Sequence, residues 1–146
     1  MIGGMERQPA RGHRNIPHTA DVRIEAWAPD REGCVAEAIT ALVDTFVDTT
    51  GAAADGEAAF RVPPGADADL LVGVLDEVIF RMETAGELPL ETEVRAADDG
   101  GLAVRWRTTG TDAVELVGAV PKAVSLHELS FAAESDGWRC AVTLDV

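Results

Sequence analysis

Residues 21–48, DVRIEAWAPDREGCVAEAITALVDTFVD, have the residue pattern of a strand followed by a helix. Up to Ala28, apolar and polar residues alternate, as a strand with one buried face requires. Asp21 belongs to the more polar face of that strand. Asp30 then supplies a suitable N-cap, and apolar residues recur at helical spacing as far as Asp48. The segment predicts a half-buried strand followed by an amphipathic helix.

A second strand and helix follow. The short apolar segment 58–62 ends at a double proline, and the apolar stripe after it ends at Gly86, a residue typical of helix ends. Beyond Gly86 the helical period disappears, and four alternating segments are expected as strands near 90–97, 102–108, 117–131 and 138–146. This order favours an α+β fold in which two helices pack on one face of a largely antiparallel sheet.

The size of the chain, 146 residues, is that of one ordinary domain. Residues 1–16 are rich in glycine and arginine and show no apolar period, which is typical of a disordered tail. We therefore expect a tail over 1–16 and a single domain over 17–146.

Acidic residues outnumber basic ones by 26 to 12, for a formal net charge of −14. This balance argues against direct tight binding of RNA or DNA, whose affinity for proteins comes largely from cationic side chains. The two cysteines, Cys34 and Cys140, have no CxxC spacing, which favours a reducing compartment and no zinc site. With no apolar run long enough for a signal peptide or a membrane span, we expect a soluble, cytoplasmic protein.

Two aspartates mark the outer ends of the first and last expected strands. Alternation over 138–146 places Asp145 on the polar side, like Asp21 in the first strand. If these strands are antiparallel neighbours, both side chains approach each other and the terminal carboxylate of Val146. Converging carboxylates either raise a pKa or recruit a cation, and oxygen ligands favour Mg²⁺ or Ca²⁺. The alternative is that both acids are simply solvated strand ends.

Three other residues are candidates for a functional role. Lys122 is the only lysine in the chain, which indicates either a specific role or chance in an arginine-rich composition. On a regular strand Lys122 faces away from His127, so a joint site of the two requires a bulge. His18 is expected to have a structural role beside Asp21. No nucleophile is placed to form a catalytic triad with His127, so covalent catalysis is not expected.

Four motifs together make the chain similar to the archease family. They are HTADV at 18–22, LLVGVLDEVIF at 70–80, PKAVSLH at 121–127 and LDV at 144–146. The resemblance runs from about Pro17 to Val146, and the pairing of the first motif with the last is its specific part. The sequence departs from the family pattern at Ser125 and Leu126, where the family often has threonine and tyrosine, and at Arg23, where it often has glycine.

The resemblance implies an accessory protein, not an enzyme, that activates the GTP-dependent RNA-splicing ligase of the RtcB type in tRNA splicing and RNA repair. Such proteins promote guanylylation of the ligase and multiple turnover. The resemblance also implies a divalent metal, Ca²⁺ or Mg²⁺, held at positions matching Asp21, Asp145 and Val146, and an activating lysine matching Lys122. A metal-dependent phosphoester hydrolase and a structural interaction or chaperone module remain the alternatives.

Overall fold

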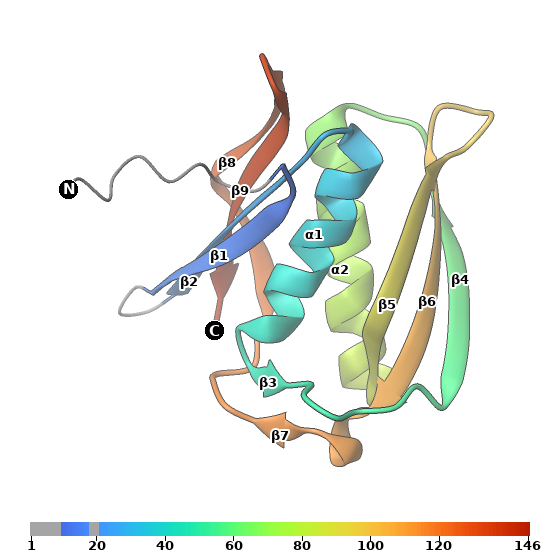
Figure 1. Ribbon diagram of the computed structural model, residues 1–146, viewed down its shortest axis with the longest axis vertical. Helices are drawn as coiled ribbons and strands as arrows, with labels where there is room; N and C mark the ends of the chain where they lie inside the picture. Colours follow the sequence, from blue (N-terminus) through green and yellow to red (C-terminus); the bar gives the residue numbers. More distant parts are fainter. Residues whose placement is uncertain (1–9, 18–20) are drawn as a thin grey trace.

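The computed structural model describes residues 10–17 and 21–146, which form two main antiparallel sheets with two helices between them (Figure 1). The first sheet has the order β1 (Gly12–Pro17), β2 (Asp21–Ala28), β9 (Gly137–Asp145) and β8 (Ala123–Glu134). The second has the order β4 (Gly56–Val62), β6 (Leu102–Gly110) and β5 (Glu87–Ala96). A two-stranded ribbon pairs β3 (Val47–Asp48) with β7 (Glu115–Leu116), and a 3₁₀ turn, η2 (Thr111–Ala113), precedes β7.

The two helices begin and end at residues suited to those positions. Helix α1 (Arg31–Asp44) starts after Asp30, whose side chain accepts a hydrogen bond of 2.6 Å from the Gly33 amide. Helix α2 (Asp67–Ala85) ends at Gly86, whose φ of +64° is left-handed and costs glycine little. Helix α1 contacts β2 and β5, and α2 contacts β8 and β5, so each helix packs against both sheets.

Alternate side chains of β2 and β9 fill the space between the first sheet and the helices. The inward residues are no more than 1% exposed: Ile24, Ala26, Ala28, Cys140, Val142 and Leu144. A slip of one residue in either strand would bury its polar set instead, so the hydrophobic pattern fixes the register. The residues in between, including Asp21 and Asp145, are thereby held on the outer face of the sheet.

The α+β class, the two helices and the largely antiparallel pairing are confirmed. The expected single sheet is instead divided in two. The reason is the breadth of the apolar surface of α1, which buries eight of its 14 residues and so needs cover on two sides. Each sheet still has the helices on only one of its faces (Figure 1).

Three expected boundaries are wrong. The helix expected to run to Asp48 ends at Asp44, and Val47 and Asp48 instead pair with β7 as strand β3. The tail predicted over 1–16 is too long, because residues 12–17 form β1, which pairs along its length with β2. The ring of His13 ties this strand to α1, with its Nδ1 2.9 Å from Oε1 of Glu37. The strand expected over 117–131 starts only at Ala123. Residues 1–9 lie outside the described residues, and the single-domain organisation stays a prediction.

Within the part of the chain that the structure describes, neither helix is long and apolar enough to cross a membrane.

Candidate functional site

The two predicted carboxylates lie directly opposite each other in the first sheet. Asp21 is the first residue of β2, Asp145 is the last of β9, and the register pairs the two. Directly opposed residues of antiparallel strands have Cβ atoms about 4.5–5.5 Å apart. Asp21 is half-buried and Asp145 is exposed. The expected pairing of the first and last strands is therefore present, while the role of these aspartates as metal ligands stays a prediction.

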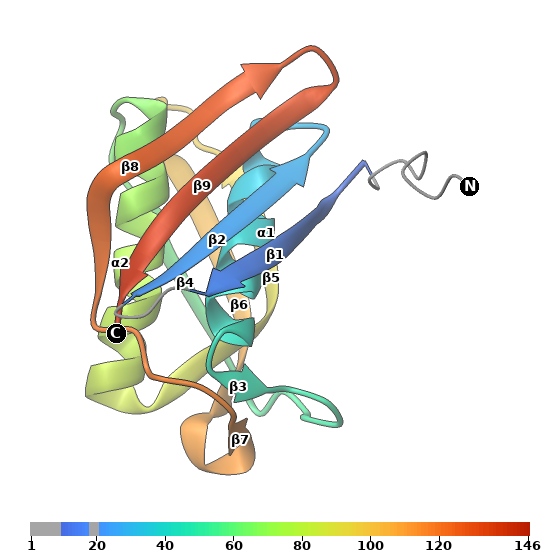
Figure 2. The ribbon, with the colours of Figure 1, turned by 90° about the vertical axis from the view of Figure 1, so that its left-hand side faces the viewer.

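Strand β8 lies on the other side of β9 from β2 and brings Lys122 close to the two aspartates. Its first residue, Ala123, pairs with Asp145, and the preceding Lys122 amide donates a hydrogen bond of 2.7 Å to the Asp145 carbonyl. Val146 follows and is half-buried, while Lys122 is exposed. Figure 2 shows the start of β2, the start of β8 and the C-terminus at the same end of the sheet. Four residues that the sequence indicated as functional therefore lie at one end of the first sheet: Asp21, Lys122, Asp145 and Val146.

No cation neutralises the two carboxylates within the described residues. Neither Asp21 nor Asp145 takes part in a salt bridge there, although most of the arginines do. Arg23, two residues along β2 on the same face, points its guanidinium elsewhere. It donates to Oγ1 of Thr143 and to the carbonyl of Glu128, each at 3.0 Å. Like charges opposed across strands destabilise a sheet, so this end of the sheet is suited to take up a cation.

The donor atoms at this position fit a hard divalent ion. Two carboxylates supply oxygen, and the main chain of Val146 adjoins them. Hard ions such as Ca²⁺ and Mg²⁺ accept carboxylate, backbone and water oxygens together. Over residues 10–17 and 21–146, no three His, Cys, Asp or Glu side chains gather as a metal site. An ion at Asp21 and Asp145 would thus complete its shell with main-chain and water oxygens.

A large bulge interrupts the pairing of β8 with β9. Ser125 pairs with Thr143 but Ser130 pairs with Ala141, so residues 126–129 of β8 face a single residue of β9. Glu128 within the bulge has a φ of +58°, a left-handed conformation that is unusual for a residue other than glycine. The Arg23 hydrogen bond to the Glu128 carbonyl holds this backbone in place.

The bulge is of the kind that a joint site of Lys122 and His127 requires. However, the His127 side chain is 85% exposed, and its Nε2 lies 3.4 Å from Oε1 of Glu128. The remaining histidine candidate, His18, lies outside the described residues. The His127 ring is thus exposed beside Glu128, and a joint site with Lys122 stays a prediction.

Arg23 is the residue at this site that sequence reasoning missed. It stands on the outer face between the carboxylate pair and the bulge, and it links three strands through Thr143 and Glu128. Two signals were available: its position two residues after Asp21 placed it on the polar face, and it stands where the family often has glycine. The bulge that it stabilises has no signature in the sequence.

The two cysteines are not candidates for chemistry. Both are buried and free, and Cys34 donates through Sγ to the Ala26 carbonyl at 3.5 Å. A hydrogen bond with Cys34 and burial raise the pKa of the Cys140 thiol. A thiol that resists ionisation is a poor nucleophile and a poor metal ligand.

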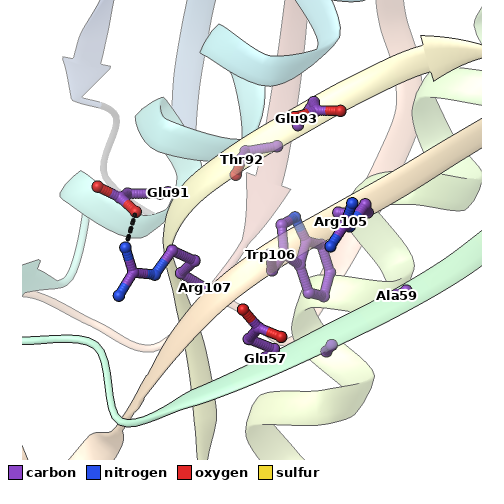
Figure 3. Close-up of a pocket in the computed structure, with 9 residues that line it drawn as sticks. Glu57, Ala59, Glu91, Thr92, Glu93, Arg105, Trp106 and Arg107 are labelled. Atoms are coloured by element: carbon purple, nitrogen blue, oxygen red, sulfur yellow. Dashed lines mark ion pairs between the residues drawn. The ribbon is translucent and has the colours of Figure 1, made fainter.

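A shallow hollow of about 500 Å³ lies over the outer face of the second sheet. Figure 3 shows its charged lining, in which Arg107 and Glu91 form an ion pair of 3.4 Å. The charged members of that lining are Glu57, Glu91, Glu93, Arg105 and Arg107. Its lining contains no histidine, cysteine or serine. The second sheet, over which it lies, is on the opposite side of the helices from β2 and β9 (Figure 1). This hollow supplies no pocket for chemistry at the carboxylate pair.

Comparison with known proteins gives a consistent result. A sequence model of the archease protein family matches residues 13–146. A probable archease of Mycobacterium tuberculosis is 51% identical over 135 residues, which are 92% of this chain and 75% of that protein. The solution structure of Methanobacterium thermoautotrophicum protein 1598 has a TM-score of 0.70 at 25% identity, over 92% of this chain and 99% of that one. The crystal structure of a Thermotoga maritima archease, called a possible chaperone, shares the fold with a TM-score of 0.65 at 22% identity, over 97% and 98% of the chains.

Proposed function

The chain belongs to the archease family, and from that membership we propose that it is an accessory protein that activates the GTP-dependent RNA-splicing ligase of the RtcB type. It promotes guanylylation of the active-site histidine of the ligase and so sustains multiple turnover, without being an enzyme itself. The observation that supports this proposal best is the opposition of Asp21 and Asp145 at a sheet end where no salt bridge neutralises them among the described residues.

In this proposal Asp21, Asp145 and an oxygen of Val146 hold a divalent cation, Ca²⁺ or Mg²⁺. When bound, the ion supplies positive charge that phosphate oxygens can approach. The role of the protein is to keep the two carboxylates together, which the fixed register of β2 and β9 achieves. Arg23 supports this arrangement from the same face by tying β2 to β9 through Thr143 and to the bulge of β8 through Glu128.

Lys122 is the second part of the proposed site. Its amide is anchored to the Asp145 carbonyl, so its side chain starts beside the carboxylate pair and is exposed. An ammonium on a flexible stem can contact a nucleotide phosphate or a carboxylate of the ligase. This placement allows Lys122 and the carboxylates to act on one target.

The charge of the molecule suits a protein partner rather than RNA. A net charge of −14 repels a phosphate backbone but complements the basic, phosphate-binding cleft of an RNA ligase. Direct tight binding of nucleic acid is therefore not part of the proposal. The two free, buried cysteines suit the reducing cytoplasm in which we place the protein.

The test is multiple-turnover ligation by a purified RtcB-type ligase with GTP, with and without this protein. Asp21→Asn, Asp145→Asn and Lys122→Ala should each reduce the stimulation by at least about tenfold, and the guanylylated ligase should fail to accumulate. Asp98→Asn, in the exposed turn between β5 and β6 of the other sheet, is the matched control and should stimulate fully. Full stimulation by all three site variants would overturn the proposal. Hydrolysis of a phosphoester by the isolated protein would favour the hydrolase alternative instead.

A further inference from the structure

Exposed apolar side chains are concentrated in one part of the sequence. Five large apolar residues of the described chain are exposed: Phe80, Leu116, Val117, Val120 and Leu126. Four of them fall between residues 116 and 126, on both sides of Lys122. Scattered single apolar residues on a surface need no explanation, but a local group of them marks an interaction site.

Three members of this group, Leu116, Val117 and Val120, lie in or next to the connector, which we define as residues 117–122 between β7 and β8. Its backbone is held at both ends. The Val117 amide donates to the Phe46 carbonyl at 2.8 Å, and the Lys122 amide donates to the Asp145 carbonyl at 2.7 Å. Gly118 packs so closely against Thr45 that no side chain would fit there. The connector and the adjoining Leu116 therefore present three apolar side chains on a backbone that is already ordered, which lowers the entropic cost of binding.

The connector leads directly to the proposed metal site. Its last residue, Lys122, is the one whose amide bonds to Asp145, and Figure 2 shows the connector passing beside the C-terminus. A partner that reaches the carboxylate pair from this side must therefore meet the exposed valines. An apolar group surrounded by polar residues is the usual composition of an interface core.

The surroundings of the connector are acidic. Asp48 and Glu115 lie directly opposite each other in the ribbon of β3 and β7, next to the pair of Val47 and Leu116. Both acids are exposed. Hydrogen bonds from Thr50 lower the pKa of Asp48, which keeps this carboxylate charged. The complementary surface on a partner consists of an apolar patch with basic side chains around it.

We propose that the connector is a docking surface for a protein partner that presents an apolar patch bordered by arginine or lysine. Resting on the proposed function, that partner is the RNA ligase, and docking here brings Asp21, Asp145 and Lys122 to its active site. A second copy of the chain is a poor occupant. In a two-fold interface the patch would meet itself, so that the Asp48 and Glu115 charges of both copies would face each other.

The experiment measures the affinity of the full chain for a purified RtcB-type ligase by biolayer interferometry. The double variant Val117→Ser/Val120→Ser should weaken binding by at least about tenfold, because apolar anchors at an interface core contribute that much or more. Phe80→Ser is the matched control, since Phe80 and Val117 are both 57% exposed but Phe80 is on α2. It should bind within about twofold of the unmodified chain. Calorimetric titration with Ca²⁺ alone should give the same metal affinity for all three proteins.

Each result separates docking from activation. Unchanged ligase binding by the double variant, or an equal loss in Phe80→Ser, overturns the docking surface even if Asp21→Asn abolishes stimulation. Loss of binding in the double variant with full stimulation by Asp21→Asn, Asp145→Asn and Lys122→Ala overturns the proposed function but keeps the docking surface. A dimer of the unmodified chain that the double variant dissolves overturns the ligase assignment in favour of a second copy. Absence of any binding by the unmodified chain overturns both.

Discussion

Replacement of Asp145 by asparagine should have opposite effects on stability in the absence and presence of a divalent metal. Asp145 lies directly opposite Asp21, and neither carboxylate has a cationic partner among the described residues. Without metal the two charges repel each other, so asparagine should stabilise the fold. With metal the repulsion becomes attraction through the ion, so asparagine should remove a stabilising ligand.

The magnitudes follow from the geometry. Two charges about 5 Å apart repel by about 0.8 kcal/mol at the dielectric constant of water and by more near a protein surface. Because Asp145 is exposed and salt screens the pair, we expect Asp145→Asn to raise the free energy of unfolding by about 0.5–1 kcal/mol in chelator. A metal at about 100 times its dissociation constant adds about 2.7 kcal/mol to the unmodified chain. The order of stability of the two proteins should therefore invert.

The assay is urea unfolding of both proteins at low ionic strength, once with EDTA and once with millimolar Ca²⁺ or Mg²⁺. Asp98→Asn serves as the control, and its free energy of unfolding should match that of the unmodified chain in both conditions. Two results would refute the reasoning. One is a variant that is less stable than the unmodified chain in EDTA, and the other is a metal effect of equal size in both.

Three further predictions concern the stability of the fold. Arg23→Ala removes one hydrogen bond to the bulge at 126–129, through the Glu128 carbonyl, and one to Thr143 of β9. The amides of the bulge should exchange faster with deuterium, and the fold should lose about 1–2 kcal/mol; unchanged exchange would contradict this role. Because a hydrogen bond with Cys34 and burial raise the pKa of the Cys140 thiol above its ordinary 9.0, stability should be intact below that pH and fall above it, by up to about 1.4 kcal/mol per pH unit. Cys140→Ala should reduce that alkaline slope in urea titrations, and an identical slope would count against the assignment. Asp30→Ala removes the cap of α1 and should cost about 1 kcal/mol in the same assay, whereas no loss would show that the cap is dispensable.

The faces of β2 and β9 could be predicted from the sequence because both strands alternate and have one buried side. That alternation placed Asp21 and Asp145 on the outer face, and their meeting required only that the first and last expected strands be antiparallel neighbours. The helices were predictable for the same reason, since their apolar stripes have a helical period. These features depend on local pattern, which a single sequence contains.

Features that depend on tertiary contacts could not be predicted. Strand β1 has no apolar alternation, and its place comes from pairing with β2 and from the contacts of His13 with α1. The bulge in β8 depends on Arg23, a residue distant in sequence. The connector was included in the expected strand 117–131, yet the connector is not a strand and its two valines are exposed. Apolar character alone does not distinguish a buried strand from an exposed segment that binds a partner.

The central place of β9 between β2 and β8 has a consequence for how the molecule forms. Arg23 and Thr143, which meet across β2 and β9, are 120 positions apart in the chain. At a synthesis rate of roughly 5–20 residues per second, β9 leaves the ribosome on the order of ten seconds after β2. Closing so long a loop makes this pairing a slow, late event in folding. The two aspartates therefore come together only once β9 has been made and has paired with β2, and until then apolar side chains of the helices that face this sheet stay exposed to solvent.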